Sequence, residues 1–214
     1  MLNIIRFSEP CSLIAYRQLP DAEYDGPHFT NVKSDIRITL LTSQGYLCAY
    51  CMMRIEDNQF TTKIEHWKSQ KDYPENQLDF SNMFAVCIGK TQGKTHCDSS
   101  RGDEEIKIDP ANTIKKVESF LKYDGLGKIY VENDSELNNE LDNIFKLNHP
   151  RLKGNRKAVL DAITRKLSTK KGTATKSELE SELNRWSGLS SDGKKQPYCG
   201  IAIFYLKKKI SRIK

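Results

Sequence analysis

The chain has 214 residues and a mass of 24.5 kDa, which is enough for one sizeable domain or two small ones, and a hydrophobic fraction of 37% is compatible with a packed core. Its longest apolar run, Ile201 to Leu206, is far too short to span a bilayer, and the first residues lack the apolar stretch of a secretory signal. These features predict a globular protein of the cytoplasm that has no membrane segment.

The charge is distributed unevenly along the chain. Residues 151–214 contain 17 Lys and Arg against 5 Asp and Glu, whereas residues 1–150 contain 17 against 23. A strongly basic segment favours a surface that binds phosphates, because each neutralised phosphate releases counterions and gains affinity. The alternative is a solvated helical face without a partner.

The first half of the chain predicts a helix followed by a hairpin. Apolar residues recur near helical spacing over residues 34–47, directly before the sequence LCAYC. Lys63 to Trp67 follows a polar stretch as a strand follows a turn, and the apolar run Met83 to Ile88 is its expected hairpin partner. The glycine-containing residues 89–103 predict a flexible connection.

The second half predicts a short hairpin and then helices. Two apolar runs within residues 118–133 flank a glycine-rich turn at residues 124–127, and an exposed loop is expected at residues 169–175. Ser177 and Glu180 form a capping-box pattern before a helix. Apolar residues at helical spacing indicate further helices at Leu137, Leu141 and Ile144 and at Val159, Ile163 and Leu167.

The six cysteines are more typical of metal ligands or small buried side chains than of disulfides, because cytosolic thiols stay reduced. Cys11 and Cys199 lie far away, near the termini. Four thiolates would form a closed tetrahedral site in which zinc is structural. His96 could replace one thiolate, and this alternative stays open. The predicted zinc ligands are Cys48, Cys51, Cys87 and Cys97.

Residues suited to phosphodiester cleavage lie around these cysteines. Glu65 and His66 precede Asn82, and Asp98 follows the last cysteine directly. Hydrolysis of a phosphodiester needs a base for the attacking water and a hard cation for the departing oxygen. Neutral imidazole suits the first task, and carboxylates bind Mg²⁺ through oxygen. Neighbouring residues of a strand point to opposite faces, so Glu65 and His66 can act together only at a bend or at the end of the strand.

The order CAYC, IEHW, Asn82 within FSNMF, Cys87, and HCD followed by Arg101 resembles the HNH endonuclease superfamily and its ββα-metal fold. Within it, LCAYCMMRI, IEHW, HCDSSRG and the trailing IDP resemble the HNH proteins that accompany retrons and Septu-type anti-phage defence systems. The match covers about residues 40–110. The resemblance implies an α+β fold with an N-terminal segment at residues 1–33, a zinc-knuckle ββα-metal core at residues 34–112 and a basic, largely helical region at residues 113–214.

Carried over to this sequence, the resemblance implies that His66 is the general base and that Asn82 fixes the loop that orients it. Glu65 and Asp98 would hold the catalytic cation, the four cysteines would bind zinc, and Arg101 would bind phosphate. The chain has Cys97-Asp98 where many members have Cys-Asn or a final His, and a second carboxylate favours Mg²⁺ or Mn²⁺ over zinc in the catalytic position. It also has Arg101 where relatives often have Lys.

The expected function is therefore a metal-dependent HNH endonuclease. The resemblance also implies partners: an ABC/AAA-like ATPase of the Septu type and, in retron systems, a reverse transcriptase with its RNA-DNA product. DNA is the favoured substrate, and tRNA or another RNA is the alternative, because the phosphate chemistry is common to both. The competing hypothesis is a catalytically inactive zinc-knuckle module that binds nucleic acid or the ATPase.

Overall fold

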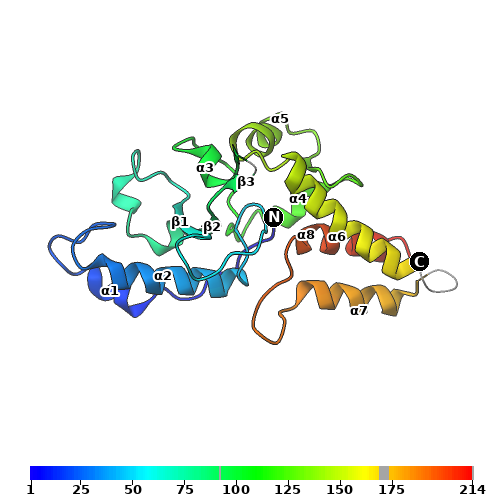
Figure 1. Ribbon diagram of the computed structural model, residues 1–214, viewed down its shortest axis with the longest axis horizontal. Helices are drawn as coiled ribbons and strands as arrows, with labels where there is room; N and C mark the ends of the chain where they lie inside the picture. Colours follow the sequence, from blue (N-terminus) through cyan, green and yellow to red (C-terminus); the bar gives the residue numbers. More distant parts are fainter. Residues whose placement is uncertain (92, 169–173, 214) are drawn as a thin grey trace.

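The computed structural model describes residues 1–91, 93–168 and 174–213 and shows a mixed α+β protein. Figure 1 shows an elongated molecule in which α1 (Cys11–Tyr16) and α2 (Phe29–Gln44) lie at one end. Helices α6 (Pro150–Ser168) and α7 (Lys176–Ser187) lie at the other end, and the short strands lie between them. The predicted loop at residues 169–175 lies mostly outside the described residues.

Helix α2 buries one face against the core and ends at a glycine. Gly45 adopts the left-handed conformation with φ 61°, which glycine reaches without the penalty of a Cβ, and its N–H donates to the carbonyl of Leu41. The helix thus begins five residues earlier than predicted and ends before LCAYC. Its buried residues recur at helical spacing and are Phe29, Val32, Ile36, Leu40, Leu41 and Gln44.

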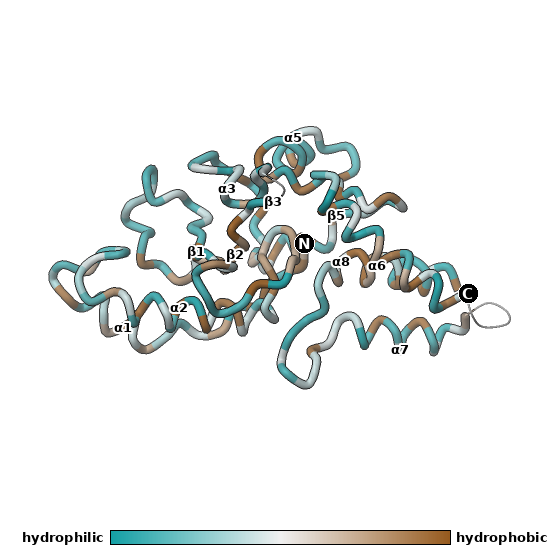
Figure 2. Tube along the Cα trace, in the orientation of Figure 1, coloured by the Kyte–Doolittle hydropathy of each residue, from teal (hydrophilic) through white to brown (hydrophobic). Residues whose placement is uncertain are grey.

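The predicted hairpin is present as β1 (Thr62–His66) and β2 (Met83–Cys87), which pair antiparallel. Every residue of β2 is buried, and Figure 2 shows hydrophobic chain at this position, in the middle of the molecule. The buried Gln44 amide bonds both the N–H of Ala85 at 2.9 Å and its carbonyl at 2.7 Å. The end of α2 is thereby fixed to the free edge of β2.

The segment after β2 contains regular structure where a flexible connection was expected. The short strands β3 (Lys90–Thr91) and β4 (Lys94–Thr95) pair antiparallel, and a single helical turn, α3 (Asp98–Arg101), follows Cys97. Gly89 at φ 63° lies against the backbone of His96, where a Cβ would come within 2.3 Å of the carbonyl oxygen. Close packing rather than flexibility therefore explains this glycine.

The C-terminal part combines one hairpin with helices, as predicted. The capping box of α7 is formed by Thr175 and Glu178, so the prediction of Ser177 and Glu180 is wrong by two residues. The remaining elements are η1 (Pro74–Asn76), η2 (Phe80–Asn82), α4 (Val117–Phe120), β5 (Leu121–Tyr123), β6 (Ile129–Val131), α5 (Ser135–Asn139), the π-helical turn η3 (Glu140–Ile144) and α8 (Cys199–Ile210).

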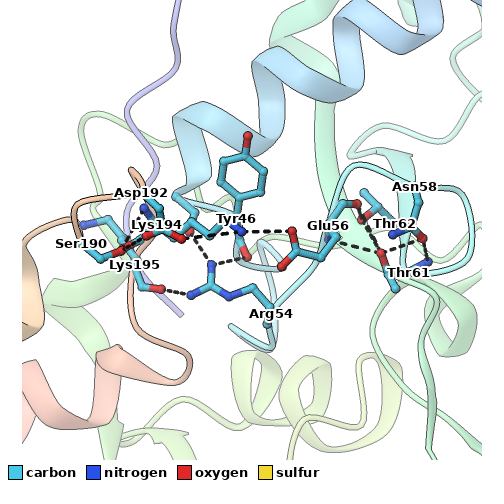
Figure 3. A network of polar contacts seen from close by, with 11 residues as sticks. Tyr46, Arg54, Glu56, Asn58, Thr61, Thr62, Ser190, Asp192, Lys194 and Lys195 are labelled. Carbon is cyan, nitrogen blue, oxygen red and sulfur yellow. Dashed lines mark hydrogen bonds and ion pairs between the residues drawn. The ribbon is translucent and has the colours of Figure 1, made fainter.

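The loop between α7 and α8 returns to the N-terminal half of the chain. Figure 3 shows Arg54 bonded to the carbonyl of Lys195 and Lys194 paired with Glu56 at 3.3 Å. The Lys194 ammonium also lies 5.1 Å from the centre of the Tyr46 ring. One continuous hydrophobic core runs from the N-terminal residues to α8. Within the described part of the chain, no helix has the length and apolar character needed to cross a membrane.

Candidate functional site

The four predicted zinc ligands come together in one buried cluster. The sulfur atoms of Cys48, Cys51, Cys87 and Cys97 all lie within 4.8 Å of one another. The Sγ atoms of Cys51 and Cys87 are 3.8 Å apart and those of Cys48 and Cys97 are 4.0 Å apart. A zinc–sulfur bond of about 2.3 Å gives tetrahedral sulfur–sulfur edges of about 3.8 Å. The cluster could therefore hold a metal ion such as zinc.

The local backbone is shaped to bring these thiols together. Met52 takes the left-handed conformation at φ 62°, and its N–H donates to the carbonyl of Cys48, which closes the turn of CAYC. Cys97 also has a positive φ, and its N–H donates to the carbonyl of Phe145 at 2.8 Å. The ring of Tyr50 packs 4.4 Å from that of Phe145. The C-terminal part of the chain thus contributes directly to the knuckle.

The chemistry of the cluster also fits a cation. Burial raises the pKa of Cys97, and hydrogen bonds from Cys48 and Cys51 raise the pKa of Cys87. Four thiols in one dry site cannot all ionise without a positive charge, which a metal ion such as zinc would supply. The Nδ1 of His96 lies 3.2 Å from the sulfur of Cys97, a contact that suits a hydrogen bond to a ligand. The four cysteines already complete the set without it.

His66 is held in a defined orientation at the end of β1. Its Nε2 lies 2.9 Å from the carbonyl oxygen of Gln77, and the ring of Tyr24 meets it edge-on at 4.6 Å. A carbonyl can only accept, so Nε2 carries the proton and Nδ1 retains its lone pair. Burial lowers the pKa of His66 below its ordinary value. The imidazole is therefore neutral at neutral pH.

Two carboxyl groups lie beside one another next to this histidine. Burial, together with the hydrogen bond to Asp98, raises the pKa of Glu65 well above its ordinary value. Burial also opposes ionisation of Asp98, but hydrogen bonds from Glu65 and Lys63 outweigh it and the pKa of Asp98 is lowered. Two carboxyls that share a site in this way favour a cation in place of the shared proton.

Arg101 is buried and directed toward β1. Its guanidinium forms an ion pair with Glu65 and donates to the carbonyls of His66 at 2.9 Å and Trp67 at 2.6 Å. Its Nε donates to the carbonyl of Glu104 at 2.9 Å. With 1% of its side chain exposed, it secures the end of the strand and Glu65. Phosphate binding by Arg101 stays a prediction that this geometry does not favour.

Asn82 fixes the loop that follows His66. Its side-chain oxygen accepts from the N–H of Lys68 at 2.7 Å, and its amide donates to the carbonyls of Lys68 at 3.1 Å and Asn76 at 3.3 Å. Asn76 lies next to Gln77, whose carbonyl orients His66. The amide thus spans both ends of the loop, which is the arrangement expected for its predicted role.

A cleft of about 880 Å³ is lined by three of the predicted site residues. Glu65, His66 and Asp98 all line it, because β1 ends at His66 and both neighbouring side chains reach the same space. Gln77 could not be predicted from side-chain patterns, because its contribution is a main-chain carbonyl. Basic residues on the cleft wall were also not predicted as part of the site. These are Lys33, Arg37 and Lys63.

A scan against models of known protein families finds no match for this chain, and a search of curated proteins also finds none. Any functional conclusion therefore rests on the geometry of the site and on the motif resemblance.

Proposed function

We propose that the protein is a metal-dependent HNH endonuclease that hydrolyses phosphodiester bonds of nucleic acid. The observation that carries this proposal is the joint placement of a neutral, oriented histidine and a carboxyl pair on one cleft wall. These are a base and the ligands for a hard cation, which are the two requirements of metal-assisted hydrolysis.

In this mechanism His66 acts through Nδ1. Gln77 holds Nε2–H, so Nδ1 takes a proton from water as its oxygen attacks phosphorus. Glu65 and Asp98 would hold Mg²⁺ or Mn²⁺, hard cations that match oxygen ligands. Such a cation, when bound, stabilises the charge that develops on the phosphate and the leaving oxygen. Asn82 keeps the loop of Gln77 in place.

The substrate class follows from the phosphate chemistry and from charge. Basic residues line the cleft, and the C-terminal helices add many more, among them Lys207, Lys208 and Lys209 at the end of α8. Such a surface binds a nucleic-acid backbone without reading its sequence. DNA is the favoured substrate, and tRNA or another RNA is the alternative.

The motif resemblance extends the proposal to an anti-phage defence role of the retron or Septu type in the cytoplasm. It supplies the expected partners, an ABC/AAA-like ATPase and, for a retron, a reverse transcriptase with its RNA-DNA product. A nuclease without such control would damage the genome of its own cell.

A second candidate is a catalytically inactive zinc-knuckle module that binds nucleic acid or the ATPase. One observation favours it: Glu65 and Asp98 already have internal cations, because Arg101 pairs with Glu65 and Lys63 with Asp98. In such a module these pairs would be permanent, and Mg²⁺ or Mn²⁺ would not bind.

The decisive experiment is a cleavage assay with the zinc-loaded protein, alone and with the ATPase, on plasmid DNA and total tRNA with Mg²⁺ or Mn²⁺. Cleavage should be lost in His66→Ala and kept in His149→Ala, a histidine outside the cleft. Cleavage of tRNA alone would keep the mechanism and change the substrate. Equal cleavage by His66→Ala would disprove the mechanism.

A further inference from the structure

Lys63 lies at the proposed cation site. It stands two positions before Glu65 on β1, and alternate residues of a strand share a face. Its ammonium bonds Oδ2 of Asp98 at 3.0 Å and Oγ of Ser99 at 3.1 Å. Within the free protein, a positive charge therefore already neutralises one of the two carboxylates that would hold the cation.

The two internal cations of the site differ in freedom. The Arg101 guanidinium has 1% of its side chain exposed and is fixed by main-chain carbonyls as well as by Glu65. The Lys63 side chain is 46% exposed and its flexible stem lies along the cleft wall. A divalent cation on Asp98 would repel both charges, but Lys63 alone of this pair is free to move away.

We propose that Lys63 is a displaceable counter-ion, which neutralises Asp98 in the free protein and transfers to a phosphate of the nucleic acid when Mg²⁺ or Mn²⁺ takes Asp98. This inference rests on the proposed function of the same site. When both ligands bind, the exchange keeps each of these charges paired, since the ammonium passes from Asp98 to a phosphate while the metal ion takes its place on the carboxylate.

The exchange couples the binding of cation and substrate. Without a phosphate, cation binding has to release Lys63 into water, whereas a bound phosphate receives it. Each ligand therefore raises the affinity of the other by the same factor. Cation binding is disfavoured before a phosphate is bound, because Mg²⁺ or Mn²⁺ then has to displace Lys63 from its ion pair with Asp98.

Lys33 provides a matched control in the same cleft. Its ammonium pairs with Asp25 at 2.7 Å, and Asp25 is not one of the proposed cation ligands. Replacing Lys33 by methionine removes the same unit of charge from the cleft wall as replacing Lys63. Any difference between the two variants therefore reports the local contact with Asp98 rather than the general field.

The test measures Mn²⁺ binding by calorimetry and by electron paramagnetic resonance, on full-length, zinc-loaded protein that carries His66→Ala so that nucleic acid stays intact. Lys63→Met should bind Mn²⁺ about tenfold more tightly, the effect of removing a unit charge a few ångströms from a divalent cation in a wet cleft. Lys33→Met should change the affinity by much less. A short DNA duplex should tighten Mn²⁺ binding more in the parent protein than in Lys63→Met.

Equal Mn²⁺ affinities for Lys63→Met and Lys33→Met would overturn the proposal. It would also be overturned if the protein bound no Mn²⁺, or if Asp98→Asn left Mn²⁺ binding unchanged. Because this readout needs no cleavage, the two conclusions separate. If Lys63→Met binds Mn²⁺ more tightly but the wild type does not cleave nucleic acid, the counter-ion role of Lys63 stands and the nuclease function is rejected. If the wild type cleaves but Lys63→Met does not change the Mn²⁺ affinity, the nuclease function stands and the counter-ion role is rejected.

Discussion

The Nε2 atom of His66 lies 2.9 Å from the main-chain oxygen of Gln77, and this contact decides which ring nitrogen can accept a proton. Because the oxygen belongs to the backbone, no side-chain substitution at residue 77 removes it. The tautomer is therefore a property of the loop conformation, and the loop conformation depends on Asn82.

The first prediction concerns the base itself. His66→Ala should lower the cleavage rate by about 100- to 10,000-fold, the usual contribution of general base catalysis. Zinc content should stay unchanged, because His66 is not one of the clustered cysteines. The free energy of unfolding should fall by about 1–2 kcal/mol, because the buried ring loses its hydrogen bond to Gln77 and its packing against Tyr24. Rate measurements at saturating Mn²⁺ with metal analysis of the same sample would check this. A rate loss below threefold would show that another group takes the proton.

The pH dependence of cleavage follows from the burial of His66. Burial lowers the pKa of the ring, and a bound cation nearby acts in the same direction. The base is active when neutral, so activity should be complete at neutral pH and fall only as pH drops below the ordinary histidine pKa of about 6.5. A rate profile from acid to neutral pH tests the sign. An acid limb centred above neutral pH would contradict it.

Asn82→Ala should separate positioning from chemistry. The change removes three hydrogen bonds, each worth about 1 kcal/mol, from the two ends of the loop. Cleavage should fall at unchanged zinc content, and proteases should cut residues 68–77 more readily. Asn138→Ala, which removes similar bonds to Val131 and Asp134, is the control and should leave both readouts unchanged. Loss of zinc in Asn82→Ala would point instead to a general loss of structure.

Arg101→Met tests whether this residue is structural. The change leaves Glu65 without its buried partner and removes hydrogen bonds to three main-chain carbonyls. The free energy of unfolding should therefore fall by about 3–5 kcal/mol. Chemical denaturation would measure it. The double variant Glu65→Met with Arg101→Met should recover part of the lost stability, because neither charge is then left buried and unpaired. Unchanged stability together with weaker nucleic-acid binding would restore phosphate binding as the role of Arg101.

The knuckle can be tested by the cysteines inside and outside it. Cys97→Ser should reduce bound zinc and destabilise the fold, because the metal-binding energy of a structural site contributes to folding. Cys11→Ser, at an exposed thiol outside the cluster, should retain one zinc and the wild-type melting temperature. Atomic absorption and thermal melting check both variants. Full zinc content in Cys97→Ser would place His96 in the ligand set.

The sequence was most informative where chemistry restricts residue type. Cysteines at the spacing of CAYC with two more further along the chain have few other uses than metal binding, and their meeting was predictable before the path of the chain was known. The hairpin of β1 and β2 was equally visible, since MFAVCI is a buried strand by composition alone. Both predictions depended on residue types, clustered cysteines and a continuous apolar run, that are rare outside metal sites and buried strands.

The failures arose where a pattern has several solutions. Thr175 with Glu178 and Ser177 with Glu180 satisfy the same capping rule, and only packing selects the first. The buried ion pair of Arg101 with Glu65 was also not foreseen, because an arginine beside acidic residues can bind a phosphate or an internal carboxylate; phosphate binding by Arg101 stays a prediction. The main-chain contact of Gln77 leaves no signature in side chains at all.

The bond from Cys97 to Phe145 has a consequence for how such a protein can be controlled or rebuilt. The backbone of Cys97 and the ring of Tyr50 both contact Phe145, which directly follows η3, so the part of the chain that carries the four cysteines cannot be exchanged without the helical part. A partner that binds α5 or η3 could therefore shift the backbone of Cys97 in the four-cysteine cluster. A shift of Phe145 would therefore be transmitted directly to the backbone of Cys97 and to the ring of Tyr50, both of which belong to the four-cysteine region.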